Sequence, residues 1–148
     1  MTLKFVALAA AAALFAAPAF AQTAAPTGNV EAGQKAFNKC QACHIVANEA
    51  GEVLAGKASK TGPNLYGMPG RVAGTYPEFK YGKSIVALGA TGFVWDEANF
   101  VEYLADPNKF LKAKLDDKGA KSNMVFKVAK EEEAKDLWAF ISSLGPKS

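Results

Sequence analysis

Four segments of the chain carry the pattern of apolar and polar residues that predicts an α-helix. The first covers residues 30–39, with Asn29 as a suitable N-cap. Its predicted apolar face is formed by Val30, Gly33, Phe37 and Cys40. A second, short helix is expected over residues 83–88 and should stop at Gly89.

The third and fourth predicted helices have clearer boundaries. The third begins after Asp96 as N-cap and ends where Asp106 precedes Pro107, because a residue before proline is disfavoured in the helical conformation. Its apolar face contains Phe100, Tyr103 and Leu104. The fourth covers residues 130–144, with acidic residues in its first turn and a Gly-Pro stop after it. Its inward face is predicted to be Ala134, Leu137, Trp138 and Ile141.

The segments between these helices are irregular in their pattern. Residues 45–61 and 62–74 are rich in glycine and are expected to be loops, and residues 108–123 are rich in lysine and only weakly periodic. No strand pattern of useful length and no internal repeat is present. The sequence therefore predicts an all-α domain of a few helices and long loops.

The first residues have the order of a secretory signal. Lys4 precedes an apolar run over residues 5–17, and Ala19-Phe20-Ala21 forms an A-x-A cleavage site. An uncleaved membrane anchor is the alternative, but a spanning helix needs about 20 apolar residues and this run is shorter. We expect residues 1–21 to be a cleaved signal peptide and residues 22–148 to be one periplasmic domain, without stable insertion into a membrane.

The mature composition adds two restrictions. Processing would leave 127 residues with 16 basic and 14 acidic side chains, so net charge alone indicates no partner. An exported protein with a single arginine is not expected to bind nucleic acid. Both cysteines lie in one short motif, which leaves no spare pair for a disulfide and suggests that a cofactor stabilises this small domain.

That motif is Cys40-Gln41-Ala42-Cys43-His44. Two thiols at this spacing, followed at once by an imidazole, are typical of covalent haem attachment, in which the next residue is an iron ligand. A thiol-disulfide redox pair would need a βαβ context, and a structural zinc site would need four ligands, but the chain has no third cysteine and no second histidine. A small structural disulfide would leave His44 without a role. The motif therefore predicts one haem c.

His44 is the only histidine, so a second axial ligand must be another group. The candidates are Met68, Met124, a deprotonated lysine or no ligand. Met68 lies in the glycine-rich loop soon after the motif, where packing is the simpler interpretation. Met124 lies 80 residues after His44, on a segment that could return over the opposite face of the haem, so we favour it. Histidine and methionine together would leave no open position on the iron.

An ordered set of residues gives the mature chain a resemblance to a known family. The set is Gly33 and Phe37, the Cys40–His44 motif, Thr61-Gly62-Pro63-Asn64-Leu65, Gly67-x-x-Gly70-Arg71, Trp95, Tyr103-Leu104-x-x-Pro107 and Met124-x-Phe126. In order and spacing it resembles class I cytochrome c, and it is most similar to the cytochrome c2 type of purple phototrophic bacteria. The resemblance implies that the terminal helices cross, with Gly33 and Phe37 against Leu137 and Phe140.

The resemblance also implies roles for single residues. The Pro63 carbonyl would accept a hydrogen bond from the non-ligating nitrogen of His44, and the Tyr103 hydroxyl would bond the sulfur of Met124. Arg71, Tyr81 and Trp95 match positions that hold the inner haem propionate, with Ser122 adding a hydroxyl. Ile85 stands near a position where many relatives have an asparagine. Extra residues are present before Pro63 and between Pro107 and Met124.

From this resemblance we expect an electron-transfer protein and not an enzyme. It would be a monomer that shuttles electrons from a cytochrome bc complex to a photosynthetic reaction centre or a terminal oxidase. A lysine-rich face around the haem edge would steer an acidic partner; its members would be Lys39, Lys57, Lys60, Lys109, Lys112, Lys114, Lys118, Lys121, Lys127 and Lys130. The alternatives are a c-type haem enzyme or a gas-binding haem protein with an open sixth position.

Overall fold

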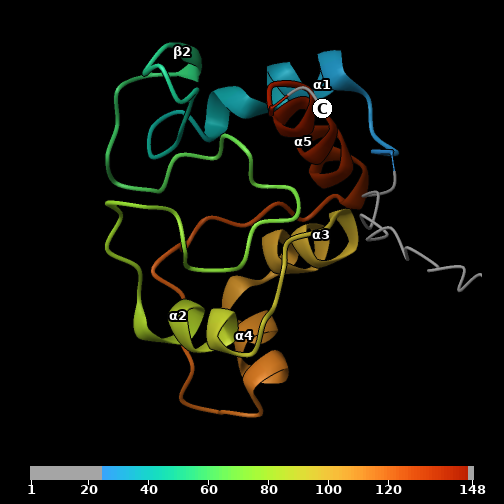
Figure 1. Ribbon diagram of the computed structural model, residues 1–148. Helices are drawn as coiled ribbons and strands as arrows, with labels where there is room; N and C mark the ends of the chain where they lie inside the picture. Colours follow the sequence, from blue (N-terminus) through green and yellow to red (C-terminus); the bar gives the residue numbers. More distant parts are fainter. Residues whose placement is uncertain (1–24, 147–148) are drawn as a thin grey trace, which may run out of the picture.

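The computed structural model of the chain describes residues 25–146. Within them the chain forms five α-helices, one 3₁₀ helix and one antiparallel sheet of two strands (Figure 1). The elements in chain order are α1 (Val30–Ala36), η1 (Phe37–Lys39), β1 (Ile45–Ala47), β2 (Val53–Gly56), α2 (Lys83–Ala90), α3 (Glu97–Ala105), α4 (Pro107–Leu115) and α5 (Glu131–Ser143). The predicted signal peptide, residues 1–21, lies outside the described residues and stays a prediction.

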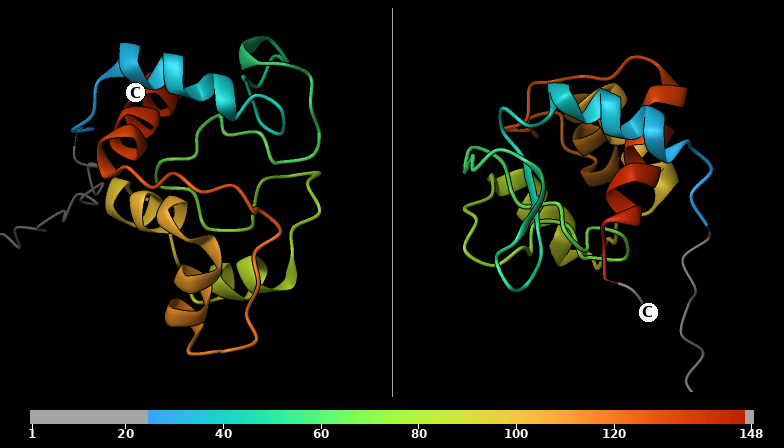
Figure 2. Two further views of the ribbon diagram at one scale, coloured as in Figure 1. Left: turned by 180° about the vertical axis from the view of Figure 1, so that it is seen from behind. Right: turned by 90° about the horizontal axis from the view of Figure 1, so that it is seen from above.

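The helices are grouped at two ends of the molecule. Helices α1 and α5 pack together at one end, α2 and α4 pack together at the other, and α3 lies between them (Figures 1 and 2). Long connections without regular structure join the two groups. This arrangement confirms the predicted fold class, a small number of helices linked by long loops.

The crossing of the two terminal helices depends on Gly33. A Cβ atom on this residue would lie 1.9 Å from the carbonyl oxygen of Asp136 and 2.8 Å from the Cβ of Phe140. The ring centroids of Phe37 and Phe140 are 5.5 Å apart beside this contact. The predicted crossing is confirmed, but Val30 does not belong to the buried face, because 43% of its surface is exposed.

The core continues from this crossing into α3 and α4. Phe100 and Leu104 of α3 are buried, and the Phe100 ring lies 5.2 Å from the Trp138 ring of α5. The four residues predicted to face inward on α5 are buried as well. A second aromatic group joins Trp95, Tyr103 and Phe110, whose neighbouring ring centroids are 5.2–6.2 Å apart.

Helix α4 lies in a segment where the pattern predicted no helix. Asp106 ends α3 in an extended conformation, and its carboxylate then accepts a hydrogen bond from the Lys109 amide as the N-cap of α4. Pro107 occupies the first helical position, where its missing N–H costs nothing. Asp106-Pro107 is therefore both the stop signal of α3 and the start signal of α4.

Two other local predictions were wrong. Residues 45–61 were expected to be a loop but contain the β1–β2 hairpin, whose strands have only three and four residues and of which β2 does not alternate in burial. Gly89 does not stop α2, which continues to Ala90. Instead Gly89 allows a close approach, because a Cβ there would lie 1.9 Å from the Ala73 carbonyl oxygen.

In residues 25–146, no helix has both the length and the apolar character that crossing a membrane requires.

Candidate haem-binding site

The Cys40–His44 motif forms a tight turn at the end of η1. The amides of Cys43 and His44 both donate to the Cys40 carbonyl oxygen, at 3.0 and 2.9 Å. Both thiols are free; Cys43 is exposed and Cys40 is half-buried. Burial, with a smaller contribution from Glu133, raises the pKa of the Cys40 thiol to about 11. A reactive redox pair needs a lowered thiol pKa, so this environment does not favour thiol-disulfide exchange.

The His44 imidazole is held by the loop that follows β2. Its Nδ1 lies 2.9 Å from the Pro63 carbonyl oxygen. A carbonyl oxygen can only accept, so Nδ1 carries the proton and Nε2 keeps its lone pair. Burial lowers the pKa of His44, and the bond to Pro63 opposes this effect. The ring is therefore a neutral imidazole with one nitrogen available as a ligand.

Gly62 provides the space that this ring occupies. A Cβ atom on Gly62 would lie 2.5, 2.7 and 2.9 Å from Cε1, Nδ1 and Nε2 of His44. The Gly62 amide also donates to the Cys43 carbonyl oxygen at 2.8 Å, which ties the loop to the motif. Gly62 belongs to the family pattern, but its spacing in the sequence indicates no role. No feature of the sequence alone showed that residue 62 lies against residue 44.

Met124 lies on an extended segment that returns after α4. Residues 120–125 alternate in exposure: Ala120 is buried, Ser122 and Met124 are partly buried, and the residues between them are exposed. Met124 packs against the hydrophobic core, and its amide donates to the Ser122 hydroxyl at 3.0 Å. Met68 is 94% buried in the same core, as expected for a packing residue.

Tyr103 and Ser122 are joined directly. Their hydroxyl oxygens are 2.8 Å apart, and either group could donate. Burial raises the pKa of Tyr103, while the bond from Ser122 opposes this shift. The predicted bond from Tyr103 to the sulfur of Met124 and the predicted bond from Ser122 to a propionate both stay predictions.

Arg71, Trp95 and Tyr81 come together from three parts of the sequence. The Trp95 amide donates to the Arg71 carbonyl oxygen at 3.0 Å. Burial raises the pKa of the Tyr81 phenol, and the nearby positive charge of Arg71 opposes this shift. The Arg71 guanidinium donates to the carbonyl oxygens of Tyr66 and Asn64, at 3.0 and 3.1 Å. A guanidinium has five N–H donors, so donors remain for an anionic group. Their role at a propionate stays a prediction.

These side chains fit a covalently bound haem. Cys40 and Cys43 supply two free thiols, His44 supplies a neutral nitrogen, and Met124 is the candidate for the opposite axial position. Residues 25–146 contain no group of three or more His, Cys, Asp or Glu side chains that could hold a metal ion. When bound, a haem iron of this type supplies one-electron transfer between Fe(II) and Fe(III).

Comparison with known proteins gives the family. No protein-family model matches the sequence. The chain is 57% identical to the cytochrome c2 of Fuscovulum blasticum over 82% of its own length and 77% of that protein's. It is 52% identical to the cytochrome c2 of Rhodobacter capsulatus, with 97% of this chain and 98% of that protein covered.

A solved structure agrees with these relatives. Cytochrome c2 from Rhodobacter sphaeroides superposes with a TM-score of 0.77 at 50% identity, covering 78% of this chain and 95% of that one. The identities and coverage confirm the resemblance inferred from the ordered motifs. The chain belongs to the cytochrome c2 family of class I cytochromes c, which are electron-transfer proteins with one covalently bound c-type haem.

Proposed function

We propose that this chain is a periplasmic one-electron carrier that takes electrons from a cytochrome bc complex and delivers them to a photosynthetic reaction centre or a terminal oxidase. Its haem would be attached through Cys40 and Cys43, with His44 and Met124 as axial ligands. The observation that carries the proposal is the His44–Pro63 contact of 2.9 Å, because it leaves Nε2 free on the residue that follows the two free thiols in the motif.

The ligand pair distinguishes this function from its alternatives. A haem enzyme or a gas-binding protein would need an open position on the iron. Met124 lies on a segment whose inward side chains contact the core, where a thioether could fill that position. A methionine ligand would raise the reduction potential and leave iron suited to passing electrons.

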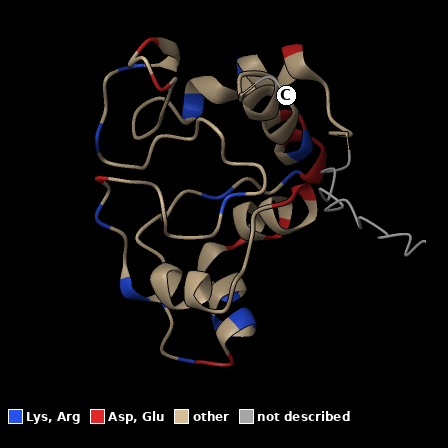
Figure 3. Cartoon of the chain, viewed as in Figure 1, with Lys and Arg blue, Asp and Glu red and all other residues tan. Residues whose placement is uncertain are grey.

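The charge distribution supports a docking face for an acidic partner. Lysines are numerous on α4 and on the segment that follows it, whereas acidic residues gather on α3 and at the start of α5 (Figure 3). Two of the lysines are ion-paired: Lys114 with Glu102 and Lys127 with Asp106. Among the described residues, five others have no carboxylate within 4.0 Å; they are Lys109, Lys112, Lys118, Lys121 and Lys130.

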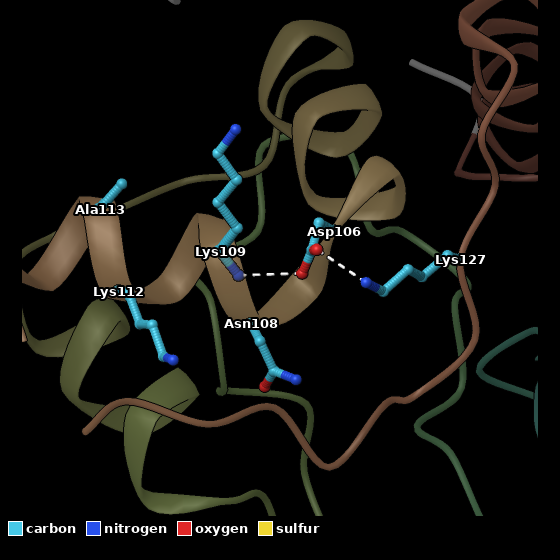
Figure 4. A pocket seen from close by; sticks show the side chains of 6 residues that line it. All are labelled: Asp106, Asn108, Lys109, Lys112, Ala113 and Lys127. Atoms are coloured by element: carbon cyan, nitrogen blue, oxygen red, sulfur yellow. Dashed lines mark hydrogen bonds and ion pairs between the residues drawn. The ribbon is translucent and has the colours of Figure 1, made fainter. Parts of the chain in front are cut away.

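One shallow depression is bordered by two of the unpaired lysines, Lys109 and Lys112, and by the ion-paired Lys127. It has a volume of about 550 Å³ and is lined by Asp106, Asn108, Lys109, Lys112, Ala113 and Lys127 (Figure 4). The amino group of Lys127 points to Asp106, so Lys109 and Lys112 supply the net positive charge there. Such rim charges act mainly on the rate of association, over about 8 Å at physiological salt.

The test is the second-order rate of cytochrome oxidation by purified reaction centres, or by a terminal oxidase, over a series of salt concentrations. The rate should fall as ionic strength rises. Lys112→Glu and Lys121→Glu should lower the rate at low salt and flatten its salt dependence, with the reduction potential nearly unchanged. Lys35→Glu on α1, at the other end of the molecule, is the matched control. A flat profile for the wild type, or equal effects of all three reversals, would contradict electrostatic steering by this face.

A further inference from the structure

Two consecutive amides just before Met124 are each held by a side chain from a different helix. The Lys121 amide donates to the Ser84 hydroxyl of α2 at 3.0 Å, and the Ser122 amide donates to Oδ1 of Asn108 on α4 at 2.8 Å. We refer to these two bonds as the latch. Asn108 lies on the side of α4 beside the returning segment (Figure 4). Neither Ser84 nor Asn108 was expected from the sequence to act on the site.

The latch replaces backbone hydrogen bonds that this segment lacks. Within the described part of the chain, the amides of Ala120 and Val128 donate to backbone carbonyls, but the amides of residues 121–127 do not. Three of those amides donate to side-chain oxygens instead: Lys121 and Ser122 through the latch, and Met124 to the Ser122 hydroxyl. The position of the Met124 backbone therefore depends on Ser122, and that of Ser122 depends on Asn108.

Packing on the other side of the segment agrees with a fixed position. A Cβ atom on Gly82, the residue before α2, would lie 3.0–3.1 Å from three atoms of the Asn123 side chain. The Ser122 hydroxyl is also in contact with Tyr103 of α3, at 2.8 Å. Residues 121–123 are thus held against α2, α3 and α4 by polar side chains, while Val125 beyond them is 83% exposed.

We propose that Asn108 and Ser84 are positioning residues that control how often Met124 leaves the iron. The inference rests on the proposed role of Met124 as the sixth ligand. An outward movement of the segment would carry the sulfur away from the iron, and this movement has to break the latch. Removing one neutral hydrogen bond should therefore raise the frequency of release about fivefold.

Asn108→Ala is the informative variant because it should stabilise helix α4 but weaken the hold on the Ser122 amide. Asn108 is exposed in the first turn of α4, where alanine is the better helix former. If Asn108 served only α4, the variant would be neutral or slightly stabilising. If Asn108 holds the Ser122 amide, release of Met124 becomes faster in the variant although helix α4 itself becomes more stable. Asn108→Asp keeps the acceptor oxygen and should restore the wild-type behaviour.

The experiment uses ferric holoprotein and imidazole as the probe. At high imidazole concentration, the rate at which imidazole binds the iron reaches a limit that is set by the release of methionine. Amide hydrogen exchange measures the opening of the two latch hydrogen bonds separately. Asn108→Ala should raise the limiting rate about fivefold and speed exchange at the Ser122 amide. Ser84→Ala should do the same at the Lys121 amide. Asn108→Asp and Ser84→Thr should remain close to the wild type.

Asn99→Ala is the matched control. Asn99 lies in the first turn of α3, and among the described residues its side chain makes no hydrogen bond. Its limiting rate should be unchanged. An unchanged limiting rate in Asn108→Ala, with the methionine signature of the ferric spectrum lost in Met124→Ala, would overturn the latch and leave the ligand assignment intact. A signature that survived in Met124→Ala would overturn the ligand assignment and the inference together.

Discussion

The Nδ1 atom of His44 lies 2.9 Å from the carbonyl oxygen of Pro63. This contact fixes both the tautomer and the plane of the imidazole, and it leaves Nε2 with a free lone pair. Residue 62 sets how closely the loop approaches, since its hydrogen-only side chain leaves room for the ring. Two backbone features of one loop thus orient the imidazole that we propose as an iron ligand.

Gly62→Ala should disturb this arrangement. The new methyl group would lie less than 3.0 Å from three ring atoms, so the imidazole or the loop must move and the bond to Pro63 must lengthen. We expect a lower yield of native holoprotein and a weakened proximal bond, seen as a lower iron–histidine stretching frequency in the Raman spectrum of a five-coordinate ferrous form. Gly119→Ala, where the nearest atom is a movable Asp117 oxygen at 3.2 Å, should behave as the wild type. Equal behaviour of the two variants would contradict the role of Gly62.

Gly33→Ala should destabilise the crossing of α1 and α5. Alanine favours a helix by about 1 kcal/mol over glycine. Here, however, its Cβ would lie 1.9 Å from the Asp136 carbonyl oxygen, a backbone atom that no rotamer change can move. Overpacking of this kind costs about 3 kcal/mol, so the free energy of unfolding should fall by about 2 kcal/mol. Denaturant titration of the holoprotein measures this change, and an increase in stability would show that the helices do not cross at this residue.

The Asp106 carboxylate provides a prediction that depends on pH. Its bond from Lys127, followed by the bond from the Lys109 amide, lowers its pKa (Figure 4). Because the folded-state pKa is below the unfolded value, the resulting stabilisation is present at neutral pH and is lost as the pH falls through the lowered pKa. Lys127→Met should raise the pKa of Asp106 toward its ordinary value.

An NMR titration of the Asp106 carboxyl carbon measures this shift. Lys121→Met removes a lysine of the same extended segment that makes no bond to Asp106, and it should leave the titration unchanged. The same midpoint in wild type and in Lys127→Met would mean that the ion pair does not persist in solution.

Several elements could be predicted because their signals are local. Asn29 and Asp96 cap α1 and α3 as expected, through side-chain bonds to the amides of Ala32 and Asn99. The inward face of α5 follows from spacing alone. Helix α4 was not predicted because Asp106-Pro107 both ends one helix and begins the next, and the lysine-rich segment after it is only weakly periodic. The hairpin was missed because its strands are too short to show a period.

The site was predictable to the extent that it is contiguous. The Cys40–His44 motif lies in one turn of the chain, so its chemistry follows from residue types and spacing. Contacts between distant segments carry no such signal, and the resemblance alone suggested Pro63 as the partner of His44. Gly62 matters because it has no side chain, and Asn108 because its exposed side-chain amide accepts a hydrogen bond. Neither feature stands out in a single sequence.

The central claim, a haem ligated by His44 and Met124, is tested most directly by the optical spectrum of the ferric protein during a redox titration. The wild type should show the weak long-wavelength band of methionine-ligated ferric haem and should titrate as one electron at a high potential. Met68→Leu should keep both properties, whereas Met124→Ala should lose the band and shift to a lower potential. Loss of the band in Met68→Leu and its survival in Met124→Ala would contradict the account.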